Sequence, residues 1–165
     1  HSTDKSERCG FRPVVDAHHF NFVLCSPLQR ARRTAELLGL GDAAEIDDDL
    51  HEWNYGDYEG ITTKVIRETV PGWTIWSNPC PNGETGAAVA TRAQRVIDRA
   101  LAASGDVALV AHGHYLRVLA ATWLGLPPED GRMFDLGTGT YCVLGFEHEY
   151  RTVIRWNAPG PESSA

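Results

Sequence analysis

The sequence of 165 residues lacks a long apolar run and an excess of basic residues. No stretch reaches the roughly 18 apolar residues that a membrane-spanning helix needs, and the first residues are polar. The formal net charge of −7 opposes a nucleic-acid or anionic membrane partner, because both would be repelled at long range. We therefore expect a cytoplasmic protein that binds neither nucleic acid nor membrane.

Cysteine is scarce and never paired in the sequence. Cys9, Cys25, Cys80 and Cys142 are widely separated and form no CxxC motif. This spacing favours separate buried thiols over a disulfide framework or a zinc site. Hydrophobic residues make up 42% of the chain and charged residues 22%, which is typical of a globular protein and excludes a disordered one. We expect one domain over residues 1–157 and a loose tail over 158–165.

Short apolar runs alternate with segments of helical spacing along the chain. The predicted elements are a strand at 20–25, helices at 28–38, 62–70 and 85–103, a strand at 106–111, a helix at 115–124, and two antiparallel or edge strands at 141–146 and 151–156. The unbroken apolar run at 106–111 is typical of a parallel strand buried on both faces. The predicted class is α/β: a three-layer fold with a mostly parallel central sheet and helices on both faces.

Two predicted strand ends carry polar side chains. Ser26 and Pro27 follow the first strand, with Arg30 one helical turn later, and His112 follows the strand at 106–111. Ser26 is a candidate cap for the helix after it. Ligands of open α/β sheets bind beyond the carboxyl ends of the strands, so central strands would bring Arg30 and His112 into one crevice. An arginine fork and a histidine suit phosphate or carboxylate oxygens, although a solvated Arg30 fits the local pattern as well.

Four segments of the sequence resemble the histidine phosphatase (phosphoglycerate-mutase-like) superfamily, in that family's order. Residues 25–35 (CSPLQRARRTA) resemble its SPLxRAxxTA segment, and residues 50–60 (LHEWNYGDYEG) its LxExxxGxxEG segment. Residues 82–85 (NGET) are similar to its GES element, and residues 110–114 (VAHGH) to its second histidine motif. The sequences of these segments are most similar to the acid-phosphatase and sugar-bisphosphatase branches. The resemblance implies a phosphoglycerate-mutase-like fold.

The resemblance also implies roles for individual residues. Arg30 would clamp the transferred phosphoryl group, Glu52 would donate a proton to the leaving alkoxide, and His112 would hold phosphate oxygens and stabilise transition-state charge. Thr85 and His114 are further substrate-binding candidates, although Thr85 equally suits a helix cap and His114 the start of the next helix. The implied substrate is a small phosphomonoester, a sugar or other organic phosphate. Neither a cofactor nor a metal ion is expected.

The family's nucleophile is a histidine in an Arg-His-Gly motif at the end of its first strand, and these 165 residues contain no Arg-His-Gly. Residues 3–15 resemble the helix that follows that strand. His18 and His19 precede a strand, so we expect them at the wrong end of the sheet. We therefore expect the nucleophile, and with it a phosphohistidine intermediate, to depend on residues upstream of His1.

Other functions remain open at this stage. A module that binds a phosphate ligand without hydrolysing it fits the missing nucleophile, and a phosphoglycerate mutase fits the family. A metal-dependent hydrolase could use the pair His112 and His114, but no further ligands stand at suggestive spacing. Trp73 and Trp76 either line the site as part of a loop that covers it, or fill the core beneath a long loop. The expected partner is a small phosphorylated metabolite, and a homodimer is left open.

Overall fold

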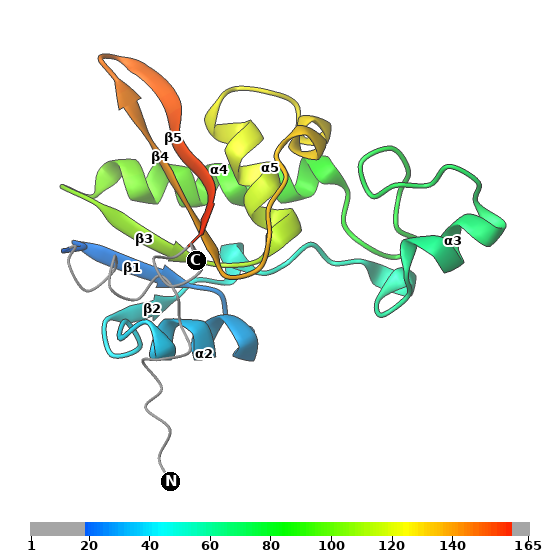
Figure 1. Cartoon of the computed structure of the whole chain (residues 1–165), viewed down its shortest axis with the longest axis horizontal. Coiled ribbons are helices and arrows are strands. Elements are labelled where there is room, and N and C mark those ends of the chain that lie inside the picture. Colours follow the sequence, from blue (N-terminus) through cyan, green and yellow to red (C-terminus); the bar gives the residue numbers. More distant parts are fainter. Residues whose placement is uncertain (1–18, 160–165) are drawn as a thin grey trace, which may run out of the picture.

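The computed structural model describes residues 19–159 of the chain (Figure 1). Its elements are β1 (Phe22–Cys25), α2 (Gln29–Leu37), β2 (Ala44–Ile46), α3 (Thr63–Thr69), α4 (Gly86–Ala102), β3 (Val107–Val110), α5 (Gly113–Trp123), β4 (Thr140–Glu147) and β5 (Tyr150–Pro159). Short 3-10 turns occupy Asp48–Leu50, Gly56–Tyr58 and Pro128–Met133. No helix in the described part of the chain is long and apolar enough to cross a bilayer. The expectations for residues 1–18 lie outside the described residues.

A parallel sheet in the order β2-β1-β3 forms the centre of the fold. Cys25 at the end of β1 stands opposite Ile46 and Val110, so the three strands end at one edge. Leu24 packs into the core built by α4 and α5, whereas Cys25 packs against α2. Successive strand residues face opposite sides, so helices cover both faces of the sheet, as Figure 1 shows. The predicted α/β class with a mostly parallel sheet is confirmed.

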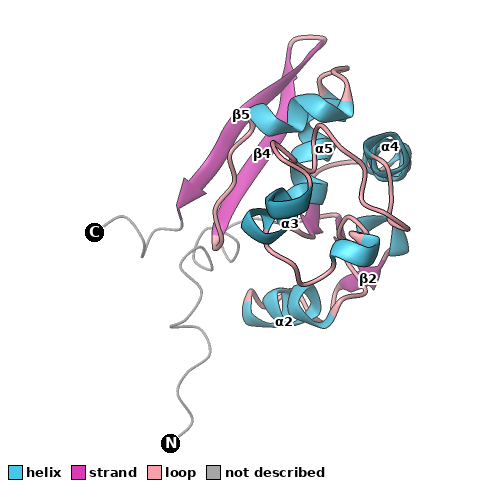
Figure 2. Ribbon diagram, turned by 90° about the vertical axis from the view of Figure 1, so that its right-hand side faces the viewer, coloured by secondary structure: helices cyan, strands magenta, loops and turns pink. Residues whose placement is uncertain are grey.

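The carboxyl-terminal strands form an antiparallel hairpin beside this sheet, as predicted. Figure 2 shows the hairpin on the α5 side of the molecule, with α4 beyond α5. Trp123 of α5 meets Phe146 of β4 edge to face at 5.3 Å between ring centroids and donates its indole N–H to a carbonyl of β5. The strand β5 runs to Pro159, two residues into the segment expected as a tail, because Ala158 pairs with Tyr141.

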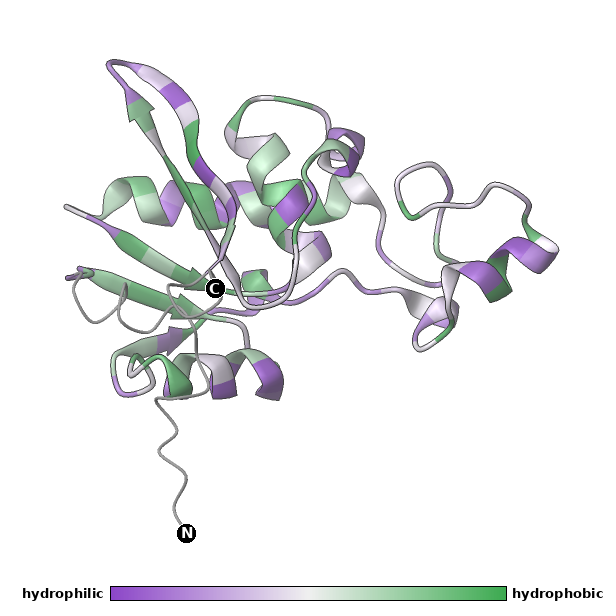
Figure 3. Cartoon of the chain, viewed as in Figure 1, coloured by the Kyte–Doolittle hydropathy of each residue, from purple (hydrophilic) through white to green (hydrophobic). Residues whose placement is uncertain are grey.

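Three local expectations were wrong. The strand β2 was not predicted, because its three residues are too few to show a period and its pairing with β1 defines it. The strand β3 was expected to be buried on both faces, but within the described residues it lies at an edge of the sheet, and only Val110 is buried. Figure 3 nevertheless shows that β1 and β3 consist mostly of hydrophobic residues.

The third correction concerns Ser26. The helix α2 begins at Gln29 with Leu28 at its N-cap, so Ser26 is not the cap that was predicted. The Ser26 hydroxyl accepts a hydrogen bond from the Leu28 N–H at 3.2 Å and is otherwise turned toward the site described below. The buried hydroxyl therefore serves His112 and the N–H of Leu28, the residue before the helix, rather than a helical N–H group.

The long loop between α3 and α4 is irregular, as predicted, and partly buried. Trp73 is 5% exposed and packs in the core with Trp53, which favours the core-filling interpretation for that tryptophan. Trp76 is only half-buried and lies edge to face against Trp53 at 5.7 Å. The same Trp76 ring also meets His114, so this side of the loop reaches the candidate site.

Candidate active site

His112 and Arg30 meet at the edge of the sheet where β1 and β3 end. His112 is the N-cap of α5 and is only 6% exposed, and Arg30 lies in the first turn of α2. The Arg30 Nε–H donates to His112 Nδ1 at 3.1 Å, and His112 Nε2 lies 2.7 Å from the Ser26 hydroxyl oxygen. Because arginine can only donate, Nδ1 must accept, so His112 carries its proton on Nε2 and donates it to Ser26.

This arrangement favours a neutral His112. Burial, the largest cause, lowers the pKa of His112 below its ordinary value, and the neighbouring charges of Arg30 and His51 act in the same direction. The charge of the Glu52 carboxylate acts in the opposite direction. The described residues give the terminal nitrogens of Arg30 no hydrogen bond, and its side chain is exposed. The guanidinium can therefore receive an anion while its Nε holds His112.

Glu52 lies at the amino-terminal end of α5 and is only 7% exposed. Its Oε1 accepts hydrogen bonds from the backbone N–H groups of Trp53 and Tyr115, both at 2.9 Å. Its Oε2 accepts one longer bond, 3.3 Å, from the N–H of His114. A helix amino terminus offers unpaired N–H groups and a partial positive charge, so it fixes a carboxyl group at this place. Oε2 is the oxygen with room for a proton or a ligand.

An ion pair behind Glu52 fixes the loop that carries it. Glu84 receives two bonds from Arg92, one to each carboxylate oxygen and both 2.9 Å long, and accepts the Asn54 N–H at 2.8 Å. Arg92 also donates to the backbone carbonyls of Asp49 and His51 at 2.9 and 2.8 Å. The sequence offered no local signal for Arg92, because its partners lie far along the chain. The hydrogen bonds of the Arg92 guanidinium therefore connect α4 to the residues on either side of Glu52.

The imidazole of His114 is enclosed by aromatic rings. Its Nδ1 lies 2.6 Å from the Tyr55 hydroxyl, and the rings of Tyr55 and Trp76 meet it edge to face, each at 5.7 Å. Burial lowers the pKa of His114, against the opposing charge of Glu52. His114 is thus in the first turn of α5, the structural role foreseen for it, and its backbone N–H bonds to Glu52. Its contact with a substrate stays a prediction.

Thr85 caps α4, accepting the Ala88 N–H at 3.1 Å, which is the structural role foreseen for it. Its contact with a substrate stays a prediction. Among residues 19–159 no group of three or more histidine, cysteine or acidic side chains is placed to hold a metal ion. Cys25, Cys80 and Cys142 are free thiols, and burial raises the pKa of each.

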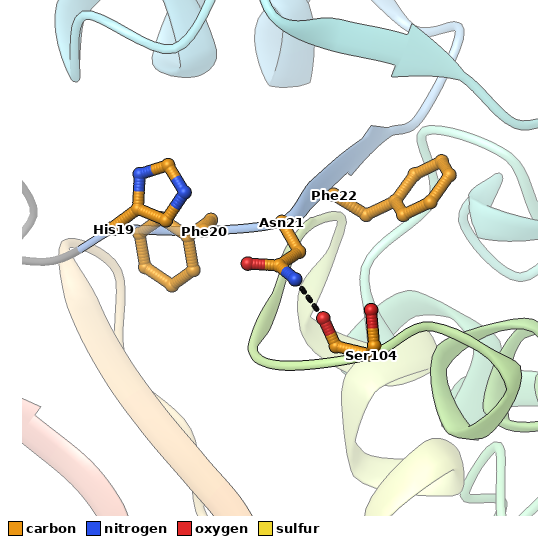
Figure 4. A pocket seen from close by; sticks show the side chains of 5 residues that line it. All are labelled: His19, Phe20, Asn21, Phe22 and Ser104. Atoms are coloured by element: carbon orange, nitrogen blue, oxygen red, sulfur yellow. Dashed lines mark hydrogen bonds between the residues drawn. The ribbon is translucent and has the colours of Figure 1, made fainter.

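Two surface cavities lie away from this cluster. One, of about 380 Å³, is lined by His19 and neighbours at the amino end of β1, where the Asn21 side chain bonds to the Ser104 carbonyl (Figure 4). The other, of about 680 Å³, lies between β1, β2 and α4. Neither is lined by Arg30, Glu52 or His112. His19 lies at the amino end of β1, the end expected for it, opposite the edge that carries the site.

Comparison with known proteins decides the family. Residues 8–159 match the model of the histidine phosphatase superfamily (branch 1). The chain belongs to that superfamily. It is 43% identical over 131 residues to an acid phosphatase of Mycobacterium tuberculosis, and 36% identical over 137 residues to a sedoheptulose 1,7-bisphosphatase of Saccharomyces cerevisiae. These alignments cover 78% and 68% of this chain, but only 64% and 51% of the relatives.

Solved structures of the superfamily share the fold. The product of an open reading frame of Mycobacterium tuberculosis superposes with a TM-score of 0.86 at 36% identity, covering 94% of this chain and 81% of that one. A mycobacterial glucosyl-3-phosphoglycerate phosphatase in complex with VO3 superposes with a TM-score of 0.80 at 25% identity, covering 96% and 86%. The expected phosphoglycerate-mutase-like fold is confirmed.

Proposed function

We propose that the protein hydrolyses small phosphomonoesters, with Arg30, Glu52 and His112 in the site. The observation that carries the proposal is the direct contact between Arg30 and His112 at the strand ends. Glu52 is bonded to the first turn of α5, the helix that His112 caps. The two relatives, an acid phosphatase and a sedoheptulose 1,7-bisphosphatase, support phosphate-ester chemistry. Phosphoryl transfer needs donors on the phosphate oxygens and a proton for the leaving group, and these three side chains are of the required types.

In the proposed reaction, Arg30 receives phosphate oxygens on its free terminal nitrogens. His112 already uses both ring nitrogens, so it reaches the phosphate by exchanging its Nε2–H bond from Ser26 to a phosphate oxygen. That exchange keeps the tautomer that Arg30 imposes. It also requires no movement of the α5 backbone, because only one hydrogen bond changes its acceptor.

The covalent route runs through a histidine nucleophile of an Arg-His-Gly motif, which these 165 residues do not contain. An imidazole nitrogen of that residue attacks phosphorus as the bond to the ester oxygen breaks, and Glu52 transfers its proton to the departing alkoxide. Water then attacks phosphorus, the nitrogen–phosphorus bond breaks, and the proton of the water returns to Glu52. The products are the alcohol and inorganic phosphate, so atoms and charges balance.

The test uses the product of the complete gene with p-nitrophenyl phosphate as substrate. We expect Arg30→Ala and His112→Ala each to lower kcat/KM by about 100-fold or more, because each removes a donor from the transferring phosphoryl group. Arg33→Ala is the matched control, since it removes the same charge from the same exposed helix without a contact to His112. Wild-type rates in the Arg30 and His112 variants would refute these roles.

A second candidate is a module that binds a phosphate ligand without turnover, for which the exposed guanidinium of Arg30 would be sufficient. Thermal unfolding with inorganic phosphate or vanadate distinguishes the two. A binding module is stabilised by the anion through Arg30 but hydrolyses nothing, whereas a phosphatase does both. Loss of the stabilisation in Arg30→Ala, together with absence of hydrolysis by the wild type, would establish the binding module.

A further inference from the structure

The hydroxyl of Ser26 stands at the end of a chain of hydrogen bonds that runs through the site. Ser26 directly follows β1 and is fully buried, and its oxygen lies 2.7 Å from His112 Nε2. His112 Nδ1 accepts the Nε–H of Arg30 at 3.1 Å, so the proton of the neutral ring is on Nε2. The donors of this chain therefore all point one way, from Arg30 to His112 and from His112 to Ser26.

The oxygen of Ser26 has no capacity left to accept another hydrogen bond. A serine hydroxyl accepts two bonds and donates one. The Nε2–H of His112 takes one lone pair of this oxygen, and the backbone N–H of Leu28 takes the other at 3.2 Å. Among the hydrogen bonds of residues 19–159, the O–H proton of Ser26 has no acceptor. Because a buried donor without an acceptor costs free energy, a ligand that brings an acceptor is favoured at this place.

A phosphate group bound to Arg30 can supply that acceptor. The Arg30 side chain is exposed, and the described residues leave its terminal nitrogens without a hydrogen bond, so they can bind an anion. A phosphate oxygen that takes over the Nε2–H of His112 has to come within about 3 Å of that nitrogen. The Ser26 oxygen already lies 2.7 Å from the same nitrogen, so the phosphate oxygen arrives beside the hydroxyl.

We propose that Ser26 is a further phosphate-binding residue: its hydroxyl donates a hydrogen bond to an oxygen of the phosphoryl group, beside the Nε2–H of His112. The proton stays on Ser26. A hydrogen bond to a charged oxygen is stronger than a neutral one, which makes this acceptor preferable to water. The inference rests on the proposed function, because it assigns Ser26 to the phosphoryl group that Arg30 and His112 bind.

Isothermal titration of the complete gene product with inorganic phosphate measures this contact without turnover. We expect Ser26→Ala to raise the Kd for phosphate by about tenfold or more, because a hydrogen bond to a charged group is lost. If Ser26 were only a resting partner for His112, its removal would free the Nε2–H for the anion, and the Kd would stay the same or fall. That result would overturn the proposal.

A second pair of variants separates a direct contact from an effect that passes through His112. In the background of His112→Ala, we expect Ser26→Ala to weaken phosphate binding further by severalfold, because the hydroxyl bonds to the phosphate itself. If Ser26 acts only by holding the imidazole, the double variant should bind phosphate as weakly as His112→Ala alone. Equal Kd values for these two proteins would refute the direct contact.

Thr62→Ala is the matched control for the loss of a hydroxyl that accepts a backbone N–H. The Thr62 hydroxyl accepts the N–H of Val65 at the start of α3, and the described residues show no bond from it to Arg30, His112 or Ser26. We expect the Kd for phosphate to be unchanged in this variant. A Kd raised as much as in Ser26→Ala would attribute the effect to lost stability and overturn the proposal.

The titration also separates this inference from the proposed hydrolysis. If the wild type binds phosphate but hydrolyses no phosphomonoester, the proposed function fails, and a tenfold higher Kd in Ser26→Ala still supports the contact. If the wild type hydrolyses p-nitrophenyl phosphate and Ser26→Ala binds phosphate equally well, the contact fails and the phosphatase remains.

A spectroscopic measurement tests the starting arrangement on the wild type alone. Nitrogen-15 NMR of the histidine rings, with the His112 signals assigned by their absence in His112→Gln, reports which ring nitrogen carries the proton. We expect Nδ1 of His112 to be unprotonated and Nε2 to be protonated in the free protein. An unprotonated Nε2 would itself accept the Ser26 proton, and this result would contradict the proposal.

Discussion

Replacing Arg92 by methionine should destabilise the protein far more than the loss of an ordinary surface charge. The Arg92 and Glu84 side chains are only 13% and 22% exposed, and the fork also serves two backbone carbonyls. Breaking a fully buried pair costs about 3–5 kcal/mol. Because this pair is partly solvated, we expect the free energy of unfolding to fall by about 3 kcal/mol, or the Tm by about 6–12 °C.

The assay is urea unfolding followed by tryptophan fluorescence, on wild type, Arg92→Met, Glu84→Met and the double variant. The Glu84 carboxylate is left without its partner in the single variant, so the double variant should recover about 2 kcal/mol. A loss below about 1 kcal/mol in Arg92→Met would refute the reasoning, because it would place the pair among exposed ion pairs of little value. We also expect kcat/KM to fall in Arg92→Met, since the fork fixes the loop that carries Glu52.

Three further predictions follow from the geometry. Gly56→Ala should lower the free energy of unfolding by about 3 kcal/mol or more, because its φ is +55° and a Cβ would collide with a backbone carbonyl. Gly72→Ala is the comparison: its φ is +76° but the space around it is open, so we expect a loss of about 1 kcal/mol in the same urea assay. Ser26→Ala should cost about 2 kcal/mol by leaving the His112 Nε2–H without its acceptor, and an unchanged urea midpoint would contradict this. Burial lowers the pKa values of His112 and His114 in the folded protein, so the unfolded chain binds protons at higher pH than the folded one. The free energy of unfolding should therefore fall as the pH drops below about 6.5, by about 1.4 kcal/mol per pH unit for each residue. Tm scans of wild type and His114→Gln between about pH 7.5 and 5.5 measure this pH dependence, and an identical dependence in the variant would exclude His114 as a contributor.

Much of the site could be predicted because its residues stand at recognisable places in the chain. Arg30 follows a strand by one helical turn and His112 ends another strand, and parallel strands place such residues at one edge. Glu52 could be identified only because residues 50–60 resemble the LxExxxGxxEG segment of the family. Nothing in its local spacing distinguishes it from a surface carboxylate, yet the structure leaves it 7% exposed at a helix amino terminus.

The supporting residues could not be predicted, because their partners are distant in sequence. Ser26 was assigned to a helix cap, and its main partner is His112, 86 residues away. Tyr55 meets His114 across 59 residues, and Arg92 reaches the carbonyl of Asp49 across 43. Hydrogen bonds of this kind depend on side-chain direction and on loop packing, which no periodicity encodes.

The amino-acid sequence by itself determined the alternation of apolar strands and amphipathic helices, and with it the parallel sheet, because burial requires those periods. It also determined which side chains stand at the strand ends. Only the tertiary structure decided the tautomer of His112, the three amides that hold Glu52 and the enclosure of His114, because each depends on hydrogen-bond donors and acceptors that folding brings together from separate segments.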